Sequence, residues 1–379
     1  GGWVAHAKQG ILGVIRSSGL LPEAYAFGLC YALNSVANRP SFLDGAWSPS
    51  GFASFFPRAF LYKTPITTLA LAALAALAAP LLLRSRDRGV WRRFGWVVIL
   101  MGVYWAACLA SPINIGHRHL LPAYPPLHIL AAAPVATVAR GSHMRGALAA
   151  LLIFAASAWE LSQVHPHHLA FFNAAAGGPE RGYTRLVDSS LDWGQALKGI
   201  APALERMGVS KKQKVYLALF GWDTPQSALR INGFTDVSTL MHVPHGADTF
   251  EWRLQAGVMA VSATVLQMVY PEDVSFSRGR PWSNETEREY ARLLKTIARL
   301  GPELISQGPK HPLLSQVWIL VVRMDKMRTS LLLQKLRTRT PDATVGHAVL
   351  LYTLGEEVLG PRDDLPELGP PTVGRDFLV

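Results

Sequence analysis

Pro65–Leu83, PITTLALAALAALAAPLLL, is a run of 19 residues without a charged side chain. A helix of this length reaches across roughly 29 Å, which matches the ~30 Å hydrocarbon core of a bilayer. Three further apolar stretches follow it, at residues 95–110, 120–139 and 146–161. The sequence therefore predicts about four transmembrane helices within residues 63–163. The alternative, buried helices of a water-soluble core, does not explain why almost no acidic residue lies between the stretches.

Charge is distributed unevenly along the chain. Residues 1–163 contain 13 Lys and Arg against 4 Asp and Glu, whereas residues 164–379 contain 24 against 22. The overall excess of +11 thus lies mostly in the apolar part. Such a distribution is typical of a protein that is oriented in a membrane and attracted to anionic lipid. Because the sequence has no basic stripe with interleaved aromatic residues, nucleic acid is not an expected partner.

One arginine-rich loop sets the predicted orientation. RSRDRGVWRR, residues 84–93, has five arginines and one aspartate, and the positive-inside rule puts such a loop in the cytoplasm. By alternation, the turn at residues 141–146 also faces the cytoplasm and the loop at residues 111–119 faces outward. The multi-pass protein would then expose residues 1–62, and the chain from residue 164 on, outside the cytoplasm.

The rest of the chain divides by its residue pattern. Residues 1–62 are predicted to form an amphipathic segment at the membrane interface. Part of this segment is rich in aromatic residues together with Gly, Ser and Pro, which fits a loop at that level. Residues 164–355 alternate strand-like and helix-like runs, which predicts a soluble α/β domain with a mostly parallel sheet. The strand-like runs are KVYLALFGW, AGVMAVSATVLQMVY and VGHAVLLYTL, and the helix-like runs are WGQALKGIAPALERMG and ETEREYARLLKTIARLG. Residues 356–379, rich in Pro and acidic residues, are predicted to be disordered.

The motif GHRHLLPAYPP, Gly116–Pro126, lies at the start of the third apolar stretch and combines potential cations with prolines. His117, Arg118 and His119 can donate hydrogen bonds or carry positive charge, and Tyr124 adds a hydroxyl group. These side chains either anchor the helix at the interface or bind an anionic ligand. Lys63, just before the first apolar stretch, has the same two interpretations, a snorkelling anchor or a phosphate contact.

A second candidate is DSSLDWGQ, residues 188–195. Asp188, Asp192, Trp193 and Gln195 could contact an acceptor or a sugar. The structural alternative, which we favour from sequence, has Asp192 capping the following helix while Trp193 packs the α/β domain onto the transmembrane helices.

Metal and cofactor signatures are not found in the sequence. It contains no phosphate-binding loop, dinucleotide-binding motif or spaced Cys/His zinc motif. HPHH, residues 165–168, offers imidazole nitrogens but has neither a Cys partner nor a Glu-x-x-His context, so an interfacial cluster with Phe171 and Phe172 is the favoured interpretation. No metal site and no cofactor are predicted, and a divalent metal remains a possibility without support.

Five phrases, taken in order, resemble one family: FFPRAFLYKTPITTL, NIGHRHLLPAYPP, HPHHLAFFNAAAGGPERGY, LVDSSLDWGQALK and GVMAVSATVLQMVY. Together they are similar to the C-terminal portion of bacterial membrane glycosyltransferases of the GT-C class. These polyprenyl-phosphate-sugar-dependent enzymes are related to protein O-mannosyltransferases and the aminoarabinose transferase of lipid A. The resemblance covers roughly residues 20–355. It implies a protein of the bacterial inner membrane that moves a sugar from a lipid-linked donor to an unknown acceptor on the outer face.

The resemblance also suggests roles for the motif residues. It implies that the carrier phosphate is bound by cations and hydrogen-bond donors, for which the candidates are His117, Arg118, His119, Tyr124 and Lys63. Such side chains lower the barrier when they lie where the charge of the leaving phosphate develops.

In that family the catalytic carboxylate is an aspartate in the first outer loop. The membrane part of this sequence has only four acidic residues, none in such a motif: Glu23, Asp44, Asp87 and Glu160. We therefore expect the general base upstream of this chain, which would be part of a longer enzyme. The alternative is a non-catalytic membrane-anchored protein whose outer domain binds a glycan or a partner. A transporter is less favoured, because no apolar stretch contains a charge pair.

Overall fold

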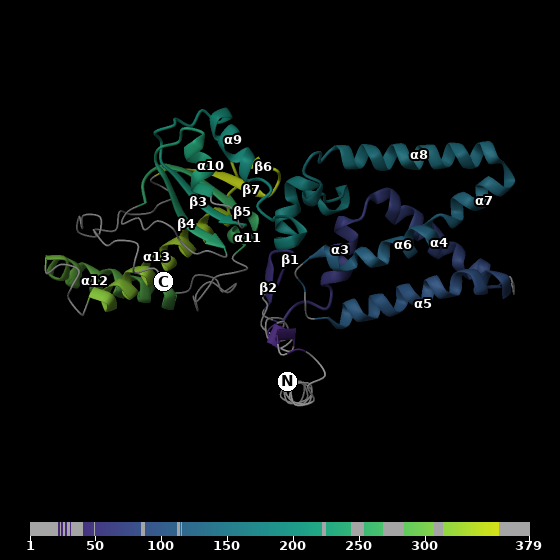
Figure 1. The fold of residues 1–379 in the computed structure, drawn as a ribbon, viewed down its shortest axis with the longest axis horizontal. Helices are drawn as coiled ribbons and strands as arrows, with labels where there is room; N and C mark the ends of the chain where they lie inside the picture. The colour runs from purple at the N-terminus through teal and green to yellow at the C-terminus, as the bar shows by residue number, and fades with distance from the viewer. Residues whose placement is uncertain are drawn as a thin grey trace.

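The computed structural model describes residues 41–48, 50–84, 88–111, 114, 116–221, 225–243, 254–267, 284–306 and 314–355, with a few isolated positions before residue 32. Helices α3 to α8 lie on one side of the molecule and a sheet with its own helices on the other (Figure 1). We call these the helical region (residues 55–162) and the sheet region (residues 200–354), and residues 163–199 the connecting segment. The predicted disordered tail, most of the predicted interface segment and Asp87 lie outside the described residues.

Helices form at all four apolar stretches. They are α3 (Phe55–Lys63), α4 (Ile66–Arg84), α5 (Arg88–Ala110), η1 (His117–Ala123), α6 (Tyr124–Ala131), α7 (Ala133–Gly141) and α8 (His143–Ser162). Two continuous runs, His117–Gly141 and His143–Ser162, are long and apolar enough to cross a membrane. A third is obtained only if Phe55–Lys63 and Ile66–Leu77, bent by 116°, form one span, and Phe94–Ala110 is a shorter apolar helix.

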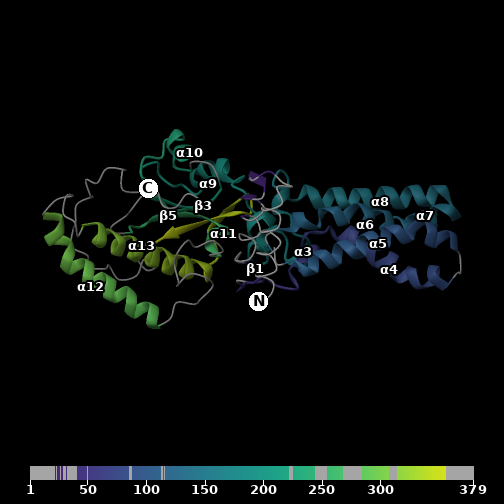
Figure 2. The same ribbon diagram turned by 60° about the horizontal axis from the view of Figure 1, so that its bottom comes forward.

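Large apolar side chains on α8 are exposed instead of being packed in a protein core. Leu151, Leu152 and Phe154 are 62%, 61% and 72% exposed. A contiguous surface of this kind is unfavourable in water, so it marks a surface that another apolar phase or partner covers. Figure 2 shows α4 to α8 running beside one another on the side of the molecule away from the sheet.

Prolines divide the third apolar stretch. The sequence predicted one helix over residues 120–139, but the chain forms η1, α6 and α7 in succession. Pro122 lies inside the 3₁₀-helix η1, while Pro125 and Pro134 lie in the first turns of α6 and α7. Proline lacks a backbone N–H and fits a first turn, where that N–H has no partner within the helix. The prolines therefore divide the continuous run His117–Gly141 into successive helical segments.

The sheet region contains a five-stranded mixed sheet. Its strands are β3 (Val215–Phe220), β4 (Val237–Val243), β5 (Gly257–Ser262), β6 (Ala343–Val345) and β7 (Val349–Leu354), in the order β4-β3-β5-β7-β6. β3 pairs in parallel with β4 and β5, whereas β7 pairs antiparallel with β5 and β6. The α/β architecture is as predicted, but half of the strand pairings are antiparallel. A separate antiparallel pair is formed by β1 (Ser41–Leu43) and β2 (Ala46–Ser48).

Alternating side chains of β3 build a core on each face of the sheet. Val215, Leu217 and Leu219 join one buried cluster, and Tyr216 and Ala218 join another. Successive residues of a strand point to opposite faces, so the uniformly apolar sequence fits a sheet covered on both sides. The covering helices are α9 (Ile200–Arg206), α10 (Pro225–Ile231), α11 (Ala263–Leu266) and α13 (Leu314–Arg337), with α12 (Asn284–Ser306) packed on α13.

Two strand predictions were too long. AGVMAVSATVLQMVY becomes helical after Ser262, whose hydroxyl accepts the backbone N–H of Val265 and so caps α11. VGHAVLLYTL is a hairpin, because Gly346 and His347 both have positive φ, of 57° and 56°, between β6 and β7. They are the central residues of a tight turn that the Ala348 N–H closes onto the Val345 carbonyl at 3.1 Å, within the three-residue loop 346–348.

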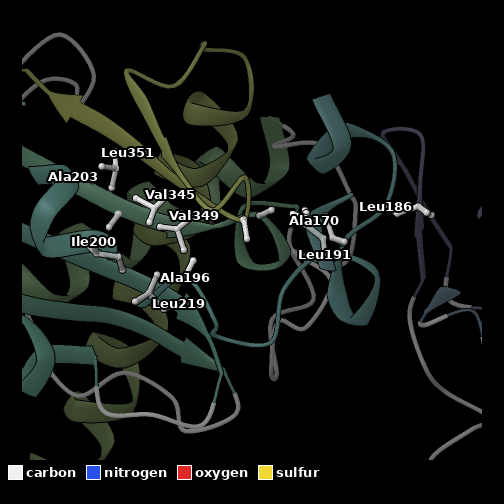
Figure 3. Close-up of a cluster of buried hydrophobic side chains, with 14 of the residues drawn as sticks. Ala170, Leu186, Leu191, Ala196, Ile200, Ala203, Leu219, Val345, Val349 and Leu351 are labelled. Carbon is white, nitrogen blue, oxygen red and sulfur yellow. The ribbon is translucent and has the colours of Figure 1, made fainter. Parts of the chain in front are cut away.

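One buried cluster connects the regions (Figure 3). Ala170, Leu186 and Leu191 of the connecting segment belong to the same cluster as Ile200 and Leu219 of the sheet region. The cluster also includes apolar side chains of the helical region, namely Phe55, Phe56, Ala59, Cys108 and Leu120. The connecting segment is therefore packed between the two regions, and this packing determines where the polar motifs meet.

Candidate functional site

The C-terminal end of α3 lies where the helical region meets the connecting segment. Thr64 is extended, with φ −92° and ψ 132°, as expected for a residue before a proline. The side-chain amide of Asn173 donates to the carbonyl oxygens of Leu61 (2.5 Å) and Thr64 (2.8 Å). The backbone N–H of Asn173 donates to the carbonyl oxygen of Tyr62 (3.0 Å). Carbonyl groups at a helix end have no partner within the helix, so Asn173 acts as a distant cap of α3.

Lys63, the last residue of α3, is buried and joins two parts of the connecting segment. Its Nζ donates to the carbonyl oxygens of Leu169 and Ser190, both at 2.7 Å, and lies 4.3 Å from the ring centre of Phe172. An ammonium group has three N–H donors, so two are engaged with backbone carbonyls. A phosphate contact at Lys63, as predicted from sequence, would have to use the third.

His117 contacts the same serine as Lys63, and Tyr124 contacts His117. The backbone N–H of His117 donates to Ser190 Oγ at 3.0 Å, and His117 Nε2 lies 2.7 Å from the Tyr124 hydroxyl. That hydroxyl is 2.5 Å from Thr64 Oγ1. Three of the five predicted phosphate residues, Lys63, His117 and Tyr124, are thus brought together around Ser190 and Thr64.

Arg118 reaches in another direction. Its side chain is exposed, and its guanidinium carbon lies 5.5 Å from the ring centre of Trp193. Within the part of the chain that the structure describes, the guanidinium has neither an ion pair nor a hydrogen bond. Trp193 is 40% exposed, and its ring lies 5.6 Å from that of Phe220 at the end of β3. The structure therefore joins one residue from each of the two sequence motifs.

His119 contacts the helical region instead. Its ring packs edge-on against Phe56, with centroids 6.4 Å apart, and its carbonyl accepts a hydrogen bond of 2.5 Å from the Tyr104 hydroxyl. The three polar side chains of the motif therefore meet three different neighbours. A 3₁₀-helix has three residues per turn, so consecutive side chains leave η1 about 120° apart.

The DSSLDWGQ segment forms a tight turn around Asp188, whose φ is 57°. The Asp188 carbonyl accepts from the backbone N–H groups of Leu191 (2.8 Å) and Asp192 (2.9 Å), and its own N–H donates to Thr264 Oγ1 at 2.9 Å. The turn leaves Asp192 with no solvent exposure. Asp192 Oδ1 accepts from the Gly194 N–H at 2.9 Å, while Oδ2 has no hydrogen-bond partner among the described residues.

The prediction that Asp192 caps the following helix was wrong. Asp192 caps only the turn at Gly194, and after the short η6 (Leu197–Gly199) the α-helix begins at Ile200. Gly194, with φ 81°, is one reason, because a left-handed residue cannot continue a helix. Pro202 is another, because starting at Ile200 places the proline in the first turn of α9.

Burial of Asp192 changes its protonation. Removal from water raises the pKa of the Asp192 carboxyl group to about 7, the nearby Asp188 charge adds to this, and the Gly194 N–H opposes it. The carboxyl group is thus partly protonated near neutral pH in the folded protein. In the unfolded chain, with a pKa near 3.8, it is ionised.

Asp192→Asn is expected to remove a pH dependence of stability. The folded state holds a proton that the unfolded chain releases between about pH 4 and pH 7, so wild-type stability falls as pH rises through that interval. The full fall is on the order of 4 kcal/mol, and the variant should lack it. Thermal unfolding from pH 4 to pH 8 checks this, with exposed Glu205→Gln as the control. Parallel profiles for wild type and Asp192→Asn would contradict the assignment.

Two of the acidic residues considered from sequence are engaged in structural contacts. Asp44 pairs with Arg58 (2.5 Å) and Arg185 (3.2 Å) and accepts a hydrogen bond from Tyr62. Both Glu160 carboxylate oxygens lie 3.0 Å from the Ile66 N–H, at the N-terminus of α4, where negative charge is favoured. Both carboxylates thus have structural partners, and Glu23 and Asp87 lie outside the described residues.

The histidine cluster joins the connecting segment to the sheet region. His165 Nδ1 and His168 Nε2 are 3.4 Å apart, and the His167 ring lies 6.5 Å from that of His347 in the β6–β7 turn. Burial, together with the neighbouring His347 and His165, lowers the pKa of His167. Among the described residues no group of three or more His, Cys, Asp or Glu side chains is placed to hold a metal ion.

Sequence reasoning missed Ser190 and Asn173. Ser190 lies in a motif that was singled out, but its partners Lys63 and His117 are 127 and 73 positions away. Asn173 lies in the resembling phrase HPHHLAFFNAAAGGPERGY, and its Thr64 partner is 109 positions away. No local pattern indicates such pairs.

Comparison with known proteins adds no identity to this geometry. No family model matches the chain, and neither a curated protein nor a solved structure does. The function must therefore be inferred from the residues where the helical region meets the connecting segment.

Proposed function

We propose that the chain is part of an integral membrane glycosyltransferase that takes a sugar from a polyprenyl-phosphate carrier. The single observation that carries this is Arg118, an exposed guanidinium without an anionic partner among the described residues. It lies at the start of His117–Gly141, a run long and apolar enough to cross a membrane. A lipid-linked phosphate lies at this level of a bilayer. Its lipid chain would lie beside the helices, and its head group where the helical region meets the connecting segment.

The proposed reaction gives Arg118 a defined role. An acceptor oxygen attacks the anomeric carbon of the sugar, and the bond from that carbon to the phosphate oxygen breaks. The acceptor proton passes to a general base, and polyprenyl phosphate leaves with the electron pair of the broken bond. A guanidinium holds phosphate oxygens through two parallel N–H donors, and it stabilises charge that grows during this step. His117 and Tyr124, which lie together at Ser190 and Thr64, are further motif residues that could add donors.

We further propose that four helical stretches cross a bacterial plasma membrane and that the sheet region lies outside the cytoplasm. The exposed apolar side chains of α8 support a lipid-facing surface. The arginines of residues 84–93 support the orientation. The named carrier and the bacterial setting rest on the resemblance of the five sequence phrases to the GT-C class.

A second candidate is a non-catalytic membrane protein that binds a glycan or a partner through the sheet region. The engagement of Asp44 and Glu160 in structural contacts favours it, since transfer requires a general base. The proposed enzyme would obtain this base from a part of the protein outside the chain.

Carrier turnover distinguishes the two candidates. Membranes containing the full-length protein are incubated with polyprenyl-phosphate-linked mannose, glucose or arabinose carrying a labelled sugar. The enzyme should release polyprenyl phosphate and move label to an endogenous acceptor, which mass spectrometry of the lipids and glycans then identifies. Retention of label on every carrier, with no lipid or glycan product lost in a deletion strain, would favour the binding protein.

A further inference from the structure

Trp193 is a large aromatic side chain held at the surface by its backbone. The backbone N–H of Trp193 donates to Gln195 Oε1 at 2.7 Å. The backbone N–H of the next residue, Gly194, donates to the buried Asp192 carboxyl group. Gly194 and Gly221 pack backbone against backbone: a Cβ added to Gly221, whose φ is 144°, would lie 3.1 Å from the Gly194 Cα. The loops after Asp192 and β3 therefore fit together closely, and the fit leaves Trp193 40% exposed.

The environment of the indole is asymmetric. Phe220 lies 5.6 Å away at an angle of 49° and supports the ring from the sheet region. Arg118 approaches from η1, with its guanidinium carbon 5.5 Å from the ring centre. The guanidinium thus lies over the indole at a cation–π distance but beyond the 3.5–4 Å of direct stacking, so the exposed arginine has to turn aside before another group stacks on that face. An indole and an exposed cation over its ring are thus brought together by two segments that are distant in sequence.

A sugar bonded to a phosphate matches this pair of groups. The C–H bonds on one face of a sugar ring carry partial positive charge and pack on the negative face of an indole. The hydroxyl groups around the ring stay hydrated, so a partly exposed indole suffices. The phosphate is attached directly to the anomeric carbon, which places its oxygens beside the sugar and within reach of a neighbouring guanidinium.

We propose that Trp193 is the platform on which the sugar of the lipid-linked donor stacks while Arg118 holds the adjoining phosphate. This rests on the proposed glycosyltransferase function and assigns separate parts of the donor to the two residues. Trp193 therefore contributes to recognition of the sugar, whereas Arg118 binds any carrier that ends in a phosphate. Indole rings also anchor proteins at the membrane surface, and that role predicts no such division.

Binding measurements with two kinds of probe separate the roles. Full-length protein in nanodiscs is titrated with polyprenyl phosphate and with polyprenyl-phosphate-linked mannose, glucose and arabinose, and bound lipid is measured by native mass spectrometry. Wild type should bind at least one sugar-bearing carrier more tightly than polyprenyl phosphate. Trp193→Ala should weaken binding of that carrier about tenfold, as expected for loss of one aromatic stacking contact, and leave polyprenyl phosphate unchanged within about twofold. Trp193→Tyr should restore most of the difference.

The controls separate failure of the platform from failure of the proposed function. Trp159→Ala removes another exposed indole, on α8, and should change binding of neither probe. Equal weakening of both probes by Trp193→Ala, or no weakening of either, would overturn the platform while carrier binding by wild type still supports the enzyme. Wild-type protein that binds neither probe would overturn both proposals.

Discussion

Arg118→Ala in the full-length protein is expected to lower the rate of sugar transfer by about a hundredfold or more. Loss of one preorganised donor to a developing oxyanion reduces turnover by roughly 10²–10³, and Arg118 is also the exposed cation at the proposed phosphate. The melting temperature should change little, because the guanidinium has no hydrogen bond or ion pair among the described residues and only an exposed cation–π contact with Trp193. Transfer of labelled sugar, measured with thermal unfolding on the same preparations, checks both parts.

Two further variants make the test of Arg118 specific. Arg118→Lys keeps the charge but loses the planar fork, so it should retain only part of the activity. Arg206→Ala removes an exposed arginine from α9 and should remain within about twofold of wild type, as expected of a surface change away from the site. Full activity of Arg118→Ala would exclude Arg118 from the phosphate site.

Lys63→Met is expected to lower the free energy of unfolding by about 3 kcal/mol, the largest loss of stability among the variants in this Discussion. Methionine fills a similar volume but leaves the buried carbonyls of Leu169 and Ser190 without the donor that now lies 2.7 Å from each. The loss should loosen the segments around Leu169 and Ser190 from the end of α3, while Asn173 still holds the connecting segment there. A lowered denaturation midpoint of the purified protein in detergent measures it.

The control for Lys63 is Lys198→Met, which removes an exposed lysine from η6 and should change stability by less than about 0.5 kcal/mol. Equal midpoints for wild type and Lys63→Met would contradict the structural role. A Lys63→Met protein that stays fully stable but no longer binds polyprenyl phosphate would instead place the ammonium on the phosphate, as the sequence predicted.

Local chemistry made much of the fold predictable. Uncharged apolar composition located the helical stretches. A helix forms all its backbone hydrogen bonds within its own segment, so its side chains decide whether water or apolar groups surround it. Strand ends were harder, because Ser262 caps a helix and Gly346 with His347 turns a hairpin inside apolar runs that look continuous. Only the paired backbone reveals these boundaries.

The candidate site was predictable as a set of residues but not as an arrangement. Arg118 was identified by its charge at the start of an apolar run, and Trp193 by its place in a polar motif. Their proximity follows from the packing of η1 against the connecting segment, which includes the hydrogen bond from the His117 N–H to Ser190 Oγ across 73 positions. Residue types indicated a possible chemistry, while the tertiary contacts decided which residues share it.

Binding of polyprenyl phosphate to the full-length protein in nanodiscs tests the phosphate site at Arg118 most directly. Polyprenol of the same chain length is the matched control, because it lacks only the phosphate. Wild-type protein should bind polyprenyl phosphate at least about tenfold more tightly than polyprenol, and Arg118→Ala should abolish this preference. Equal binding of the two lipids by wild type, or an unchanged preference in Arg118→Ala, would contradict a carrier-phosphate site at this residue.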